Sequence, residues 1–319
     1  MLNKLISYYE NNTIYGSWLF VGKKGTGKLQ TARDLAFHIL TKEYGEQSKA
    51  SFDNHPALKI IQRDITDAEK KELDRLEKKE LDKNSGKTIF TKERIEQCKR
   101  NKSIQVDQIR ELIESINISS SKSRIVIIDS INDLNVNAAN TLLKTLEEPP
   151  LKTIIILICH NPETILSTIK SRCRIIHFNP CGHKQMTKFL CEKYPALSEE
   201  EINVTAFYAD GAMGKAVEFI ENKGLDTYRT FQDIIENFPN ISYDAVNKTV
   251  RNLLNNKDET KIGIFKNFIL LTLAARAQRE FSEYNIYYYE KAVSMLKDSE
   301  LPLNIDAKQT LTAILTGNI

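Results

Sequence analysis

A glycine-rich loop that ends in a lysine is the part of the chain whose residue types could do chemistry. Gly22, Gly25, Thr26, Gly27 and Lys28 lie in the run Gly-Lys-Lys-Gly-Thr-Gly-Lys, which has the G-x4-G-K spacing. In such a loop, backbone N–H groups and the start of the next helix bind phosphate oxygens, and the lysine reaches the terminal phosphates. We therefore expect these five residues to form a nucleotide-binding site.

The residue after this lysine departs from the pattern. A serine or threonine hydroxyl normally holds Mg²⁺ there, whereas Leu29 offers no oxygen to a cation that requires oxygen ligands. A vestigial loop kept for its shape, or a turn that binds nothing, is the alternative interpretation. Binding of ATP or ADP stays open, and we do not expect productive hydrolysis of Mg-ATP.

A second phosphate-site element ends in Asp129. The run Arg124-Ile-Val-Ile-Ile-Asp129 is typical of an apolar strand whose terminal carboxylate reaches a water of the Mg²⁺ shell. The next residue is Ser130, and a hydroxyl cannot act as a general base at neutral pH. Aspartate is also common at strand ends because it favours turns. Asp129 is therefore evidence for a phosphate site only in combination with the glycine-rich loop.

These residues need a framework of strands and helices to position them. Short, isoleucine-rich runs predict buried parallel strands at Trp18–Val21, Leu58–Ile61, Ile125–Ile128, Ile154–Cys159 and Ile175–Phe178. Helical patterns fall between them, for example at Leu29–Leu40, Val106–Ile116 and Asn137–Leu146. We therefore predict an open α/β domain with a mostly parallel sheet over residues 1–179. From residue 180 onward the apolar spacing is helical nearly to the end of the chain.

The composition is that of an ordinary globular protein, with 27% charged and 41% hydrophobic residues. No apolar run is long enough to span a bilayer and no signal-peptide pattern is present, so we expect a cytoplasmic protein without membrane contact. The five cysteines form no C-x-x-C pair, so no metal site is expected. A net charge of +3 is too small to indicate nucleic-acid binding by itself.

That charge excess is concentrated in a predicted insertion at residues 67–103. Between Asp67 and Lys102 the chain has 12 basic and 9 acidic residues, which equals the +3 of the whole chain. Only three leucines interrupt the charges of residues 70–82, so this part predicts an exposed helix rather than a core element. A solvated surface insertion is the favoured interpretation, and a dedicated binding arm is the alternative.

Three motifs together resemble the AAA+ family of bacterial clamp-loader subunits. The helix Asn137-Ala-Ala-Asn-Thr-Leu-Leu-Lys-Thr-Leu-Glu-Glu-Pro-Pro150 is similar to a signature of that family. Cys159-His-Asn-Pro162 falls where the family carries its sensor-1 residue, so Asn161 is the matching position. Ser171, Arg172 and Cys173 match the family's SRC motif. The resemblance covers residues 1 to about 222, and the remainder matches only in length and helicity.

The helix of this signature ends with two acidic residues. Glu147 and Glu148 precede Pro149-Pro150, and carboxylates near a helix C-terminus oppose the helix dipole. This placement indicates either a role beyond stability or simply a solvated helix end.

The resemblance implies a role for Arg172 that does not depend on this chain's own loop. In the family, the SRC arginine is an arginine finger that projects from one subunit into the nucleotide site of its neighbour. There its planar cation stabilises charge on the transferring phosphate. An ordinary surface arginine near a strand start is the alternative interpretation.

Three catalytic parts of the family are missing. Leu29 replaces the Mg²⁺-binding hydroxyl, Ser130 replaces the catalytic glutamate, and Gly214 stands where active members carry a sensor-2 arginine. The combination resembles delta-prime subunits of the DNA polymerase III clamp loader, which are catalytically inactive members. The resemblance implies a helical lid over residues 180–222 and a helical collar for oligomerisation over residues 223–319.

The same resemblance implies partners. We expect a heteropentamer with the gamma/tau ATPase subunits and delta, which contacts the sliding clamp, and contacts primed DNA only as a complex. Any DNA polymerase (nucleotidyltransferase) activity would belong to the holoenzyme. Two other functions stay open: a catalytically active AAA+ ATPase, and a stand-alone DNA-binding protein. Turnover by the isolated chain would favour the first, and a salt-dependent DNA affinity of the isolated chain would favour the second.

Overall fold

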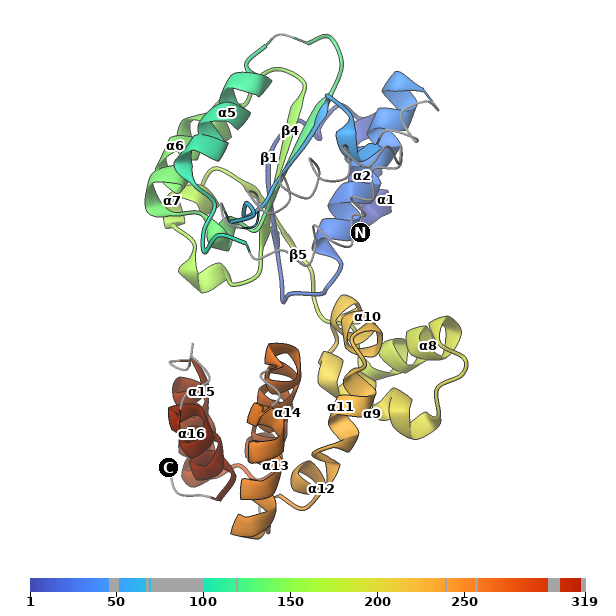
Figure 1. Cartoon of the computed structure of the whole chain (residues 1–319). Helices are drawn as coiled ribbons and strands as arrows, with labels where there is room; N and C mark the ends of the chain where they lie inside the picture. The colour runs from blue at the N-terminus through green and yellow to red at the C-terminus, as the bar shows by residue number, and fades with distance from the viewer. Residues whose placement is uncertain are drawn as a thin grey trace, which may run out of the picture. The chain divides into compact units, whose positions relative to one another are not determined.

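The structure is a computed structural model. It describes residues 1–45, 52–66, 69, 100–118, 120–238, 240–255, 258–297 and 305–316. The chain divides into two compact units, Met1–Asn179 and Pro180–Ile319, and Figure 1 labels most of their helices and strands. Apart from residues 69 and 100–103, the predicted charged insertion at 67–103 lies outside the described residues.

The described part of the first unit contains a five-stranded parallel sheet in the order β2-β3-β4-β1-β5. The strands are β1 (Gly16–Val21), β2 (Leu58–Ile61), β3 (Arg124–Asp129), β4 (Thr153–Cys159) and β5 (Arg174–His177). The predicted α/β class with a parallel sheet is confirmed. Each predicted strand is present, with ends that differ by at most two residues.

Helices cover both faces of this sheet. They are α1 (Leu2–Glu10), α2 (Lys28–Tyr44), α5 (Val106–Ile116), α6 (Val136–Glu147) and α7 (Ser167–Lys170), with 3-10 turns η2 (Phe52–Asn54), η3 (Ile131–Asp133) and η4 (Pro162–Thr164). In Figure 1, α1 and α2 lie on one face, and α5, α6 and α7 lie on the other. The sequence analysis did not predict α1, whose Leu5 and Tyr9 are buried.

The two faces of the sheet contribute to two separate hydrophobic cores. Along β1, Trp18 and Phe20 join the core on the α1–α2 side, while Leu19 and Val21 join the core on the α5–α7 side. This alternation follows from the two-residue period of a strand. The central strand β4 is buried along its whole length, which explains its uninterrupted apolar sequence.

The outermost strand β5 differs from the prediction. Its run was predicted to be buried, but β5 pairs only with β1, and Ile175 is 44% exposed. An edge strand lacks a second neighbour, so an isoleucine-rich run does not guarantee burial there. Phe178, directly after β5, is buried against Phe20.

The described part of the second unit is helical, as the sequence predicted. Its helices are α8 (His183–Lys193), α9 (Glu199–Ala209), α10 (Met213–Glu221), α11 (Gly224–Arg229), α12 (Gln232–Glu236), α13 (Tyr243–Asn255), α14 (Glu259–Arg279), α15 (Glu283–Lys297) and α16 (Ile305–Thr316). A small core forms among α8, α9 and α10, and a larger one extends from α10 to α16. The division into a lid (180–222) and a collar (223–319) stays a prediction.

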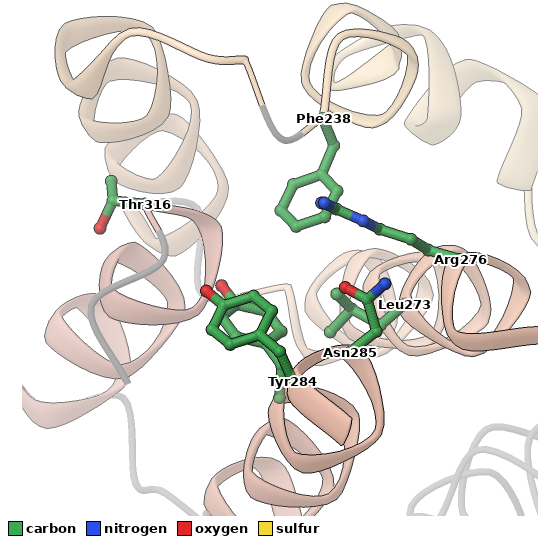
Figure 2. Close-up of a pocket in the computed structure, with 7 residues that line it drawn as sticks. Phe238, Leu273, Arg276, Tyr284, Asn285 and Thr316 are labelled. Atoms are coloured by element: carbon green, nitrogen blue, oxygen red, sulfur yellow. The ribbon is translucent and has the colours of Figure 1, made fainter. Parts of the chain in front are cut away.

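The tyrosine-rich stretch of α15 has both buried and exposed members. Tyr288 is buried and donates a hydrogen bond to the Ile314 carbonyl, whereas Tyr284 and Tyr287 are exposed. Beside them lies a cavity of about 170 Å³, whose lining residues are Phe238, Leu273, Arg276, Tyr284, Asn285, Tyr288 and Thr316 (Figure 2). None of the predicted site residues lines this cavity.

No helix in the described part of the chain is long and apolar enough to cross a bilayer.

Candidate functional site

The glycine-rich loop connects β1 to α2, in the order that the sequence predicted. Gly25 and Gly27 have φ angles of +83° and +85°, a region that favours glycine, and Gly27 is the N-cap of α2. Gly22 is required for a different reason. A Cβ atom at Gly22 would lie 2.3 Å from the carbonyl oxygen of Phe178, so only glycine fits without a shift of backbone.

Lys28 is folded back onto its own loop. Its ammonium donates hydrogen bonds to the carbonyl oxygens of Gly22 (2.7 Å) and Lys23 (2.6 Å), and contacts the Thr26 hydroxyl at 3.4 Å. Only 2% of the residue is exposed, and this burial lowers the pKa of Lys28 to about 8, against smaller opposing effects of Cys159 and Asp129. The ammonium must leave these carbonyl oxygens before it can bind a phosphate.

Asp129 is the last residue of β3, and its carboxyl group is close enough to Lys28 and Lys24 of the loop for their charges to affect its pKa. Burial and the nearby Asp133 raise the pKa of its carboxyl group, while Lys28 and Lys24 oppose that rise. The carboxylate lies at the carboxyl end of β3, and the role of Asp129 in a phosphate site stays a prediction.

His160 also lies at this site, although it was not predicted from the sequence. It is the first residue after β4, and its Nε2 atom lies 3.7 Å from Oδ1 of Asp129. Burial, together with Lys28 and Lys24, lowers the pKa of His160 to about 4, against the opposing effect of Asp133. The imidazole is therefore neutral at pH 7 and does not form an ion pair with Asp129.

Asn161, the predicted sensor-1 position, uses its side chain locally. Its Oδ1 atom accepts a hydrogen bond from the Glu163 N–H (3.2 Å) and so caps η4. The amide that joins this loop to the end of β3 is instead Asn132. Its Oδ1 atom accepts from the His160 N–H (2.8 Å), and its Nδ2 atom donates to the Asn161 carbonyl (2.7 Å) and to Thr164 Oγ1 (2.9 Å).

Asn132 and His160 could have been found from their position in the chain. Both follow the carboxyl end of a predicted parallel strand, and ligand sites of open α/β sheets form at that edge. The sequence alone does not show which asparagine, Asn132 or Asn161, joins the two loops.

The loop fits a phosphate better than it fits Mg²⁺. Backbone N–H groups of a loop that only glycine permits are donors that an anion needs, and Lys28 could add its ammonium once it leaves the loop carbonyl oxygens. Leu29 is half-buried and packs against the core of the α1–α2 face, and Ser130 is 3% exposed and caps η3 through its hydroxyl. Neither residue presents an oxygen ligand or a base, and no group of three potential metal ligands occurs among the described residues.

The Ser171-Arg172-Cys173 motif lies at the opposite edge of the sheet. β5 runs parallel to β1 with Arg174 beside Trp18, so Arg172 precedes the start of β5, whereas Gly22 follows the end of β1. The strand length from Trp18 to Gly22 alone is about 13 Å at about 3.3 Å per residue. Arg172 therefore cannot serve the glycine-rich loop of its own chain.

The three residues of this motif have different contacts. The Ser171 hydroxyl donates to the Thr168 carbonyl (3.1 Å) at the end of α7. Cys173 packs against the core of the α5–α7 face, where burial raises its pKa to about 12, so it is not a reactive thiol. Arg172 donates through Nε to Oε2 of Glu147 (3.0 Å) and through Nη1 to the Thr168 carbonyl (3.1 Å). The sequence analysis did not predict the contact with Glu147.

Comparison with known protein families gives a match to the model described as DNA polymerase III, delta subunit, over residues 1–182. This span is more than half of the 319-residue chain. The chain belongs to this family. The match covers the whole sheet, the glycine-rich loop and the Ser171-Arg172-Cys173 motif, and it supports the predicted resemblance to delta-prime-like clamp-loader subunits.

Individual relatives are also named as DNA polymerase III subunits. A delta-prime subunit of Bacillus subtilis is 27% identical over 234 residues, which are 70% of this chain and 61% of that protein. A delta-prime subunit of Pseudomonas aeruginosa is 45% identical over 74 residues, 23% of each chain. A gamma subunit of Buchnera aphidicola is 34% identical over 124 residues, 37% of this chain and 34% of that protein. The chain spans less than two-thirds of the length of these relatives.

Proposed function

We propose that the chain is a non-hydrolysing, delta-prime-like subunit of the DNA polymerase III clamp loader. Its own nucleotide site lacks the groups that hydrolysis needs, because Leu29 packs into a core and Ser130 caps a turn. Gly214, in α10, has no side chain that could replace a sensor arginine. Lys28 is bound to carbonyl oxygens of its own loop. ATP or ADP could bind this loop, but the proposed function does not require either.

The functional group that the chain contributes is Arg172, acting in the nucleotide site of a neighbouring subunit. The observation that carries this proposal is the position of Arg172 at the amino-terminal edge of the sheet, away from its own glycine-rich loop. Its side chain is 30% exposed, and the residue lies in the turn between α7 and β5. A guanidinium in this place lies away from its own loop and would be free to meet a phosphate of a neighbouring subunit, where a planar cation stabilises the transferring phosphoryl group.

The partners proposed for this chain follow from the family. They are the gamma/tau ATPase subunits and delta, assembled as a heteropentamer through the helical collar (223–319), with the sliding clamp and primed DNA as partners of the complex. Relatives named delta-prime and gamma subunits of DNA polymerase III support this set. Loading of the clamp during DNA replication would then depend on ATP hydrolysis by the neighbouring subunits.

The test is the clamp- and primed-DNA-stimulated ATPase of a reconstituted loader that contains either the unchanged chain or Arg172→Ala. An arginine finger is worth about 10³ to 10⁵ in rate at the site that it serves. We therefore expect the served site to stop contributing and total turnover to fall in part, with the assembly intact. Arg110→Ala is the matched control and should leave turnover unchanged; it removes an exposed arginine of α5 whose partner within the described part of the chain is Asp107.

Two results would overturn the proposal. Unchanged turnover with Arg172→Ala in an intact assembly would show that Arg172 serves no active site. ATP hydrolysis by the isolated chain would show that it is a motor subunit or another ATPase. A tight, salt-dependent affinity of the isolated chain for DNA would instead support a DNA-binding protein.

A further inference from the structure

The guanidinium of Arg172 is held by its own chain on two sides. Nε and Nη2 both lie 3.0 Å from Oε2 of Glu147, and Nη1 donates to the Thr168 carbonyl at 3.1 Å. A guanidinium has five N–H bonds in a fixed planar fork; the hydrogen bonds use the one on Nε and one on Nη1, and the ion-pair contact of Nη2 with Oε2 uses no more than one on Nη2. One N–H bond on each terminal nitrogen is therefore left for a further acceptor.

Glu147 occupies a place that the stability of α6 does not explain. It is the last residue of α6, where a carboxylate opposes the helix dipole, and its side chain is 60% exposed. The C-terminal end of α6 is capped without this carboxylate, because the Glu148 N–H donates a hydrogen bond to the Lys144 carbonyl. The contact with Arg172 is the one interaction recorded for the Glu147 side chain among the described residues.

The backbone that carries Glu147 is fixed to the sheet. The preceding residue, Leu146, is buried, and its carbonyl accepts a hydrogen bond from the Ser17 hydroxyl (3.0 Å) at the start of β1. Because β1 also pairs with β5, the end of α6 and the segment before β5 are anchored to the same strand. The carboxylate of Glu147 is thus presented to Arg172 from a rigid support.

We propose that Glu147 is the positioning residue for Arg172, an inference that rests on the function proposed above. Glu147 and Thr168 fix the plane of the guanidinium, so that its two remaining terminal N–H bonds can face a phosphoryl group of a neighbouring subunit. A bidentate cation is effective only when its donors are aligned with the charge that develops in the transition state. Glu147 therefore acts on the rate through Arg172 and does not contact the nucleotide.

The experiment compares Glu147→Ala with Glu148→Ala in the reconstituted loader. Both variants remove one exposed carboxylate from the same helix end, and only the first removes the contact with Arg172. Misplacement of a group at an active site by about 1 Å costs about 100-fold in rate. The served site would then contribute almost nothing, so the fall in stimulated turnover with Glu147→Ala should approach that with Arg172→Ala. Glu148→Ala should match the unchanged loader.

Two further measurements separate positioning from a general structural effect. The decrease in ATP turnover with Glu147→Ala should appear as a lower kcat at unchanged KM for ATP, because the contact of Glu147 with Arg172 acts in the transition state. Glu147→Gln keeps one acceptor oxygen and should restore part of the turnover. In the Arg172→Ala background, Glu147→Ala should cause no additional fall, because its effect passes through the arginine.

Each failure has a distinct meaning. If Arg172→Ala lowers turnover and Glu147→Ala does not, the positioning role is wrong and the proposed finger stands. If Glu147→Ala raises turnover, the contact restrains Arg172 and the inference is overturned. If neither variant changes turnover, the proposed function itself is wrong. Equal thermal unfolding of Glu147→Ala and Glu148→Ala is the check that both variants are folded.

Discussion

Burial of the Lys28 ammonium should make the stability of the first unit depend on pH in a way that one substitution removes. Burial lowers the pKa of Lys28 from 10.5 to about 8. Between these two values the unfolded chain binds a proton that the folded chain has released, so stability rises with pH through this window. Below pH 8 both states are protonated and the penalty for burying the charge is constant.

The magnitude follows from the size of the shift. One pKa unit corresponds to about 1.4 kcal/mol, so the full penalty is about 3 kcal/mol below pH 8. Relative to Lys28→Met, which has no group to titrate, the free energy of unfolding of the unchanged chain should increase by about 2 kcal/mol between pH 7 and pH 10. Methionine keeps an unbranched apolar side chain in the buried space, which limits other changes.

The single tryptophan makes this measurement specific for the first unit. Trp18 lies in β1 and is 4% exposed, so its fluorescence during urea denaturation reports the unfolding of the sheet rather than of the helical unit. The difference between the unchanged chain and Lys28→Met is measured at several pH values from 7 to 10. Lys24→Met, at an exposed lysine of the same loop, is the control. A difference between the unchanged chain and Lys28→Met that stays constant over this range would refute the reasoning.

Three other substitutions test the geometry of the site by the same fluorescence assay. Gly22→Ala should cost about 1–3 kcal/mol because its Cβ would meet the Phe178 carbonyl, and an unfolding free energy equal to that of the unchanged chain would contradict this account. Asn132→Ala should cost about 2–3 kcal/mol because it leaves several polar partners unsatisfied, while Asn161→Ala removes a single cap and should cost about 1 kcal/mol. The reverse order would mean that Asn161, not Asn132, joins the two loops.

The sheet could be predicted from sequence because its central strands are buried on both faces. Runs such as Ile154–Cys159 are apolar at every position, and the turn residues around them limit their length. The same pattern failed to predict the exposure of Ile175, since composition does not say whether a strand has one neighbour or two. Helix α1 was missed although its amphipathic spacing was available.

The site could be predicted as a set of residue types but not as a set of contacts. The positions of the glycine-rich loop and Asp129 follow from the strands that precede them. Nothing in the sequence indicates that Lys28 bonds to its own loop, because that depends on the direction of two carbonyl groups. The pair of Glu147 and Arg172 is separated by 25 residues and has no local signal.

The glycine-rich loop has a structural role that does not depend on hydrolysis. Gly22 touches the backbone of Phe178, and the Phe178 N–H donates to the Val21 carbonyl at 2.7 Å, so the start of the loop is tied to the end of β5. Arg172 lies two residues before the start of that same strand, at its opposite end. A change that displaces the loop from β5 would therefore also disturb the support of Arg172. A residue without an oxygen ligand at Leu29 leaves this connection intact, so the loop can keep this structural role whether or not it supports hydrolysis.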